Sequence, residues 1–391
     1  MGGFAVYRLP YAKQATLVRQ TEGEPLELSS CQALNGQQGF VIAPFEITPA
    51  QPIVLIRPDE TECLDLSRKV SWNVECGMWN ENSSATDSAH ASNLIPHSTF
   101  HIPQNPPQNP PHSTFHIPHD IPHSTFHIPQ YYSIDFANYH AQLENDAFRK
   151  IVLARCADEK MPEGVKPMEL FYRACALYPR LFIALVDTPK SGCWLTATPE
   201  ILLEGQGSDW RTIALAGTMK LEGDQLNGEG ESLTWSTKNI QEQRIVATYI
   251  TECLEQFTSD FREEGPRTVR AANLVHLRSD FTFRLSDHAH IGNLLQALHP
   301  TPAVCGLPKR EAFQFIVRNE HTPRRYYSGF MGSLGTDETH LYVSLRCMNI
   351  EHDTCHLYAG GGLLKDSILE QEWQETEAKL ETIRKLLDIR T

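Results

Sequence analysis

Short apolar runs bounded by Gly, Pro, Asn or Asp recur through the first part of the chain. Four of them precede residue 76, and they read FAVYRL, ATLVRQ, FVIAPF and PIVLIRP. Runs of this length with these boundaries are typical of β-strands. Residues 1–79 are therefore expected to be strand-rich and to contribute sheet and packing, since they contain no recognisable chemical motif.

Apolar residues spaced three and four apart predict helices at four later places. The predicted helices are 133–148, 167–179, 238–257 and a C-terminal helix that starts near Asp366. Apolar runs predict further strands at 150–155, 181–187, 212–220, 324–334 and 341–350. Arg346 lies inside the last of these strands. Because an unpaired buried arginine is very costly, its side chain is expected to face an anion.

Composition narrows the classes of protein to consider. The chain has 391 residues and a formal net charge of −14, which argues against non-specific binding to nucleic acid or acidic membranes. No apolar run approaches the length of a membrane span, and the first residues lack a signal-peptide core. Ten cysteines are scattered singly without a CxxC pair. They fit reduced thiols, so we expect a cytoplasmic protein without nucleic-acid or membrane partners.

Residues 80–130 differ sharply in composition from the rest. The octapeptide PHSTFHIP occurs three times there, starting at Pro96, Pro111 and Pro122. The two histidines of each copy are four residues apart, which would pair them as metal ligands only on a helix. Prolines bracket every copy and disfavour a helix. A disordered insertion is therefore expected, with a metal-binding repeat as the alternative, and deletion of 96–129 should leave catalysis intact.

Three charged side chains in the middle of the chain stand beside apolar runs. Lys150 begins the run KIVLAR; it is either a solvated strand end or, on an inner face, a partly desolvated amine that can act as a base. Glu200 precedes Ile-Leu-Leu and is either an exposed turn acid or a buried acid suited to proton donation. Glu242 lies one turn before the apolar face of the helix 238–257. It is either an acid favoured by the helix dipole or a metal ligand that needs a second acid.

The C-terminal segment combines glycines, acids and an amine. A glycine-rich turn, Gly360–Gly362, is expected to feed a helix and to expose backbone N–H groups that bind anions. Glu372, Glu375 and Lys379 share one face of that helix at the edge of its apolar stripe. Two acids beside an anion site could hold a hard metal ion. By itself, His276 in an apolar strand is more typical of a core residue than of a catalyst.

Ten motifs, in their order and spacing, resemble those of the chorismate-utilising enzymes, a family that includes anthranilate synthase component I, aminodeoxychorismate synthase, salicylate synthase and isochorismate synthase. The motifs are KIVLAR (150–155), ATPEILL (197–203), LAGTMK (215–220), KNIQEQ (238–243), VHL (275–277), LHPTPAVCG (298–306), RRYYSGFMG (324–332), SLRC (344–347), YAGGG (358–362) and EWQETEAK (372–379). The resemblance is closest to isochorismate synthase. It implies an α+β fold of two packed, largely antiparallel β-sheets with helices outside and the active site in the cleft between them. Residues 131–391 would form the chorismate-binding region, in one structural domain with 1–79.

The resemblance also implies site residues, position by position. The implied Mg²⁺ ligands are Glu242 and Glu375, with Glu372 near the metal directly or through water; the metal would clamp the C1 carboxylate of chorismate. The implied anchors for the substrate carboxylates are Lys379, Arg346 and the backbone of Gly360, Gly361 and Gly362, with Tyr327 nearby. Thr218 and His276 match further pocket positions.

Lys150 discriminates within the family, because members that use water have lysine here and members that use an amine do not. A lysine base that activates water for addition at C2 of chorismate, with Glu200 protonating the departing C4 hydroxyl, implies isochorismate synthase. The enzyme would be a monomer or weak dimer that feeds menaquinone or catechol-siderophore synthesis. Two alternatives stay open: a salicylate synthase, which also eliminates pyruvate, and a non-catalytic metal-binding protein that acts through the histidine repeat.

Overall fold

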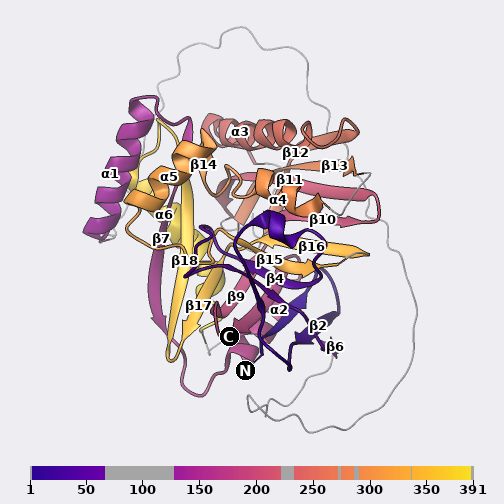
Figure 1. Ribbon diagram of the computed structural model, residues 1–391. Helices are drawn as coiled ribbons and strands as arrows, with labels where there is room; N and C mark the ends of the chain where they lie inside the picture. Colours follow the sequence, from indigo (N-terminus) through magenta and orange to yellow (C-terminus); the bar gives the residue numbers. More distant parts are fainter. Residues whose placement is uncertain are drawn as a thin grey trace. The chain divides into compact units, whose positions relative to one another are not determined.

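Two β-sheets organise the part of the chain that the structure, a computed structural model, describes: residues 2–66, 127–221, 233–271, 274–285, 290–335 and 337–388 (Figure 1). The strand order of the first sheet is β14 (Gly306–Leu307), β7 (Lys150–Lys160), β18 (Thr354–Leu363), β17 (Cys347–Glu351), β9 (Gly192–Thr198), β8 (Phe182–Thr188), β1 (Phe4–Arg8), β2 (Gln14–Arg19) and β6 (Glu60–Asp65). The order of the second is β12 (Phe261–Ala271), β13 (Leu274–Arg284), β11 (Asp209–Lys220), β10 (Ile201–Gln206), β16 (Glu338–Val343), β15 (Phe330–Leu334), β4 (Gly39–Ala43), β5 (Ile53–Ile56) and β3 (Leu26–Leu28). The pairings in both sheets are antiparallel.

The sheets pack face to face, and the helices cover their outer faces. Between the sheets, the rings of Phe182 and Tyr342 stack with centroids 4.2 Å apart within one buried apolar cluster. The helices are α1 (Gln130–Glu144), α2 (Pro167–Leu177), α3 (Thr237–Leu254), α4 (Ile291–Leu298), α5 (Lys309–Asn319) and α6 (Leu369–Arg384), with a 3-10 turn, η1, at Cys31–Leu34. α2 and α6 pack on the first sheet, and α3 and α4 on the second. The α+β fold expected from the sequence is confirmed.

The strand β7 shows how an apolar run becomes a central strand. Residues 150–155 are all buried, because β14 and β18 flank the strand and both faces are covered. The helix α6 then packs across the neighbouring strand β18 with Leu380 and Ile383 in the core. This contact brings the acidic residues of α6 next to the glycines of β18.

The chain passes from one sheet to the other at two places that position the site. The first crossing joins β9 to β10 through Pro199 and Glu200, and the second joins β16 to β17 through residues 344–346. The prediction of a single strand over 341–350 is therefore wrong. Arg346, which was expected inside that strand, has a φ of 46° and forms the turn at which the chain changes sheets.

Three further differences from the predictions lie near the site. The strand expected at 324–334 begins only at Phe330, because Arg325 and Ser328 have positive φ values of 53° and 61°. Gly360–Gly362 do not form a turn before a helix; they lie inside β18, paired with β7. The C-terminal helix starts at Leu369, after a turn in which Leu364 N–H donates to the Ser367 hydroxyl.

The described elements belong to one compact unit formed by residues 1–69 and 128–391. The three PHSTFHIP copies lie almost wholly outside the described residues, so the domain boundaries and the insertion at 80–130 stay predictions. Among the residues that the structure describes, no helix is long and apolar enough to cross a membrane.

Candidate active site

Glu200 and Arg346 come together because the two crossings between the sheets lie side by side. Val343 N–H donates to the Glu200 carbonyl at 2.9 Å, and Ala197 N–H donates to the Arg346 carbonyl at 3.1 Å. Both side chains are buried and line the same cavity. Burial raises the pKa of Glu200 to about 8, although nearby cations, Lys150 foremost, oppose this rise. A carboxyl group with this pKa is protonated at neutral pH and can donate a proton.

Lys150, on β7, and Glu242, on the helix α3, form a buried ion pair. The Lys150 Nζ lies 2.9 Å from Glu242 Oε1, and the lysine has no exposed surface. Gly217 N–H donates to Glu242 Oε2 at 3.2 Å. Burial opposes ionisation of Glu242, but the neighbouring cations, with Lys150 the strongest, hold the pKa of its carboxyl below the usual value. Gly362 makes room for the pair, because a Cβ there would lie 2.2 Å from Glu242 Oε1.

The helix α6 supplies two more carboxylates and an amine. Lys379 Nζ donates to Glu375 Oε1 and to the Gly360 carbonyl, both at 2.8 Å. Lys238, in the first turn of α3, donates to Glu372. Burial and the nearby Glu375 raise the pKa of Glu372. α3 and α6 are thus joined through the Lys238–Glu372 pair beside the glycines of β18.

His276 faces Arg346 from the strand β13. The environment of His276 holds the pKa of its imidazole well below the usual value, through burial first and then the charge of Arg346, so the ring is neutral. The Gly217 carbonyl lies 3.0 Å from Nδ1 and accepts from it. Nε2 is then left as an acceptor for the Arg346 guanidinium, which also donates to the Ala271 carbonyl at 3.2 Å. The Thr218 hydroxyl lies 3.4 Å from Nδ1.

A cavity of about 70 Å³ lies between these groups. The residues that the sequence singled out and that line it are Glu200, Thr218, Glu242, His276, Tyr327, Arg346, Gly360, Gly362 and Lys379. Lys150, Gly361, Glu372 and Glu375 are not among its lining residues.

Three carboxylates of the type that could hold a hard divalent cation, Glu242, Glu372 and Glu375, lie around Gly361 and Gly362, but their oxygens do not all lie within 4.8 Å of one another. Glu372 Oε2 is buried without a hydrogen-bond partner among the described residues. A Cβ at Gly361 would lie 3.2 Å from Glu372 Oε2 and 3.9 Å from Glu375 Oε1. These two acids therefore approach Gly361, and Glu242 approaches the next residue, Gly362. Carboxylate oxygens are the ligands that Mg²⁺ prefers. The glycines leave the space that a metal and its waters would need.

Sequence reasoning missed two residues that hold this arrangement together. Lys238 neutralises Glu372, although a lysine at a helix start is ordinarily solvated. Arg155 donates to the Thr376 hydroxyl at 2.8 Å and pairs with Glu377, while its guanidinium lies 3.8 Å from the centre of the Trp373 ring. Arg155 belongs to the KIVLAR run. Positions 150 and 155 of one strand point to opposite faces of the sheet, so the sequence could have indicated that Arg155 contacts an element on the face away from Lys150, which is α6.

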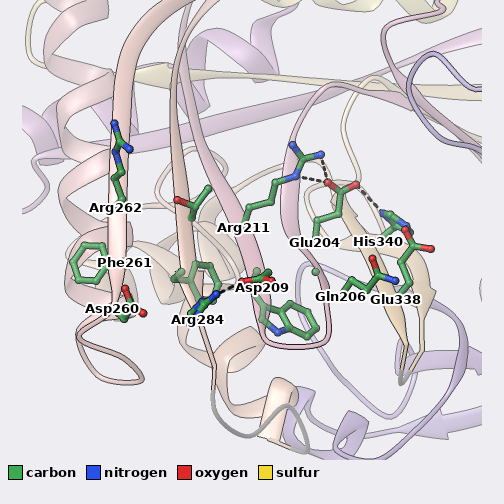
Figure 2. A pocket seen from close by; sticks show the side chains of 14 residues that line it. Glu204, Gln206, Asp209, Arg211, Asp260, Phe261, Arg262, Arg284, Glu338 and His340 are labelled. Carbon is green, nitrogen blue, oxygen red and sulfur yellow. Dashed lines mark hydrogen bonds and ion pairs between the residues drawn. The ribbon is translucent and has the colours of Figure 1, made fainter. Parts of the chain in front are cut away.

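A larger hollow, of about 480 Å³, lies at another end of the second sheet (Figure 2). Several of its charged side chains are paired with one another: Glu204 accepts from Arg211 at 2.6 Å and from His340 at 2.8 Å, and Arg284 lies 3.2 Å from Asp209. None of the residues that the sequence singled out lines this hollow. Size alone therefore does not identify the site.

Residues 81–388 match the family described as chorismate binding enzyme. The chain belongs to this family. Isochorismate synthase MenF of Escherichia coli (strain K12) is 32% identical over 242 residues, which cover 61% of this chain and 56% of that protein. The salicylate biosynthesis isochorismate synthase of Pseudomonas aeruginosa is 35% identical over 201 residues, which cover 50% and 42%. The alignments thus span about half the length of these relatives.

Solved structures show the same fold. The menaquinone-specific isochorismate synthase MenF from Escherichia coli superposes with a TM-score of 0.73 and 21% identity, covering 99% of this chain and 89% of that chain. Anthranilate synthase component I from Streptococcus pneumoniae gives a TM-score of 0.57 and 20% identity, covering 66% and 58%. The expected resemblance to the chorismate-utilising enzymes, closest to isochorismate synthase, is confirmed.

Proposed function

We propose that this protein is a Mg²⁺-dependent isochorismate synthase that converts chorismate reversibly to isochorismate. The observation that carries the proposal is the acid–base arrangement between the sheets. Glu200, a carboxyl protonated at neutral pH, lines the cavity, and the Lys150 amine lies behind the Glu242 carboxylate that lines it. Membership of the chorismate-binding family and the relatives named isochorismate synthase support it.

In the proposed reaction, Lys150 is released from Glu242 as its neutral amine and takes a proton from water as the water oxygen bonds to C2 of chorismate. The two ring double bonds shift, the C4–O bond breaks, and Glu200 gives its proton to the departing hydroxyl. One water enters and one leaves, so substrate and product are isomers and no redox partner is needed. When Glu242, Glu375 and Glu372 hold Mg²⁺, the metal supplies a positive charge for a substrate carboxylate.

The remaining lining groups would hold and orient the ring. Arg346 and Lys379 offer cationic donors to carboxylates, and the neutral His276 keeps the guanidinium of Arg346 in place through Nε2. Tyr327 packs on Tyr358 with ring centroids 5.5 Å apart, beside Gly360, where a side chain would meet the Tyr327 hydroxyl. The packed Tyr327 would form a rigid side of the pocket against which the substrate ring can lie.

The test is product analysis after incubation with chorismate and Mg²⁺. Mass and absorbance should identify isochorismate in equilibrium with chorismate, without release of pyruvate. Stoichiometric pyruvate without an added lyase would instead identify a salicylate synthase. Absence of any turnover, together with metal binding that is lost on deletion of 96–129, would support a non-catalytic protein that acts through its histidine repeat.

A further inference from the structure

A second cluster of metal-ligand side chains lies away from the candidate active site, on the pair β7 and β18. In this antiparallel pair Asp158 is opposite His356, and Cys156 is opposite Tyr358. Alternation along the strands puts Cys156, Asp158 and His356 on one face, the face that continues into the core between the sheets. One ligand atom from each residue lies within 4.8 Å of the other two.

The distances are close to those of a four-coordinate metal. Bond lengths of about 2.0–2.3 Å at a tetrahedral centre place ligand atoms about 3.3–3.8 Å apart. Cys156 Sγ lies 3.7 Å from Asp158 Oδ1, which is within that range. His356 Nδ1 lies 2.7 Å from Asp158 Oδ1, a hydrogen-bond distance. Opening this one contact by roughly 1 Å, through a turn of the exposed Asp158 side chain, brings it into the same range.

The other nitrogen of His356 already has a carboxylate beside it. Nε2 lies 3.8 Å from Glu351 Oε2, on the neighbouring strand β17. Histidine ligands of zinc usually donate their second N–H to a carboxylate, which fixes the tautomer and the ring orientation. Glu351 can serve in that role, and it is itself held by Arg325 at 2.8 Å.

We propose that Cys156, Asp158 and His356 bind one divalent transition metal of the Zn²⁺ class, with water as the remaining ligand. A thiolate, an imidazole and a carboxylate are a ligand set that suits Zn²⁺ and not Mg²⁺. The side chain of Asp158 is 67% exposed and that of His356 26% exposed, so the ion reaches them from solvent. The site is distinct from the carboxylates Glu242, Glu372 and Glu375, which offer oxygen alone.

The metal would join the two strands that also carry the candidate active site. Lys150 begins β7, and Gly360–Gly362 lie on β18. A coordinated thiol loses its proton. Binding should therefore release protons and raise the melting temperature by fixing β7 against β18.

The test is a titration of chelator-treated full-length protein with Co²⁺, followed by displacement with Zn²⁺. A thiolate-to-cobalt charge-transfer band in the near ultraviolet should appear with one equivalent of Co²⁺ and disappear with Zn²⁺. The PHSTFHIP repeats and the carboxylate site contain no sulfur, so Co²⁺ bound there gives no such band. Cys156→Ser should abolish the band, and Asp158→Asn and His356→Gln should weaken Co²⁺ binding by tenfold or more, about 1.4 kcal/mol each.

Cys63→Ser is the matched control, because Cys63 is an exposed strand cysteine without a histidine ligand partner in the described residues. It should keep the full band. A band that survives in Cys156→Ser, or that is lost in Cys63→Ser, would overturn the assignment. So would a wild-type protein that shows no band. Asp158→Asn keeps the test decisive if Cys156→Ser fails to fold, because Asp158 is exposed and its change leaves the core untouched.

Discussion

The Lys150 ammonium lies 2.9 Å from the Glu242 carboxylate, so the proposed base and a proposed metal ligand neutralise each other. Both groups are buried, and neither has another oppositely charged partner at this distance among the described ion pairs. Whatever binds to Glu242 therefore competes with Lys150. Occupation of the metal site and release of the amine for chemistry are expected to be coupled.

Lys150→Gln should lower turnover of chorismate by about 10²–10⁴-fold, because it removes the proposed general base. It should also bind Mg²⁺ more tightly, by about tenfold, because Glu242 loses its competing cation. Turnover and calorimetric Mg²⁺ titration measure the two effects. Lys365→Gln, on the surface, is the control and should change neither. Near-normal rates in Lys150→Gln would place the base elsewhere.

Without Mg²⁺, Lys150→Gln should also be less stable than the parent protein. A buried charge that loses its partner typically costs about 3–5 kcal/mol. Added Mg²⁺ should restore much of this loss, since it supplies a new partner for Glu242. Thermal melts with and without Mg²⁺ measure the effect. An equal response of both proteins to Mg²⁺ would argue against Glu242 as a ligand.

Glu375→Gln should abolish activity and Mg²⁺ binding together, because a neutral amide is a much weaker ligand for a hard cation. The matched control is Glu370→Gln, which removes the same charge from an exposed position on the same helix. That control should keep both properties. An active, metal-independent Glu375→Gln enzyme would refute the ligand assignment.

The rate of isochorismate formation should fall as the pH rises above about 8. The folded protein raises the pKa of Glu200 to about 8, and the proposed proton donor works only in its protonated form, which is lost above that pH. A pH–rate profile should show the alkaline limb in the parent enzyme. Glu200→Gln should lose most of its turnover and that limb. If the residual activity of the variant keeps the same limb, another group is responsible.

His276→Phe should raise KM for chorismate more than it lowers kcat, because the buried Arg346 guanidinium loses the acceptor that orients it. The unsatisfied donor should lower the free energy of unfolding by about 1–3 kcal/mol. Steady-state kinetics and denaturant unfolding measure these effects. His276→Gln retains an acceptor oxygen and should recover part of both losses; no recovery would assign His276 a packing role alone.

Much of the fold was readable from the sequence. The apolar run 150–155 and the apolar stripe of the C-terminal helix are local patterns. A strand buried on both faces needs consecutive apolar residues, and a helix buried on one face needs apolar residues three and four apart. The motif order likewise pointed to the family. The sequence could not show that the predicted strand 341–350 is interrupted at Arg346. The positive φ of this residue is a backbone property, and an arginine in an apolar run does not reveal it.

The sequence by itself determined which side chains carry charge and which segments are apolar enough to be buried. Only the tertiary structure decided which of these side chains contact one another. The glycines of β18 were expected to bind anions as a turn, and instead they leave room in a strand for the Lys150–Glu242 pair and for the acids of α6. The Cys156–Asp158–His356 cluster joins residues about 200 positions apart through strand register. Contacts of this kind depend on strand register within a sheet and on the packing of helices against it, which no local pattern encodes.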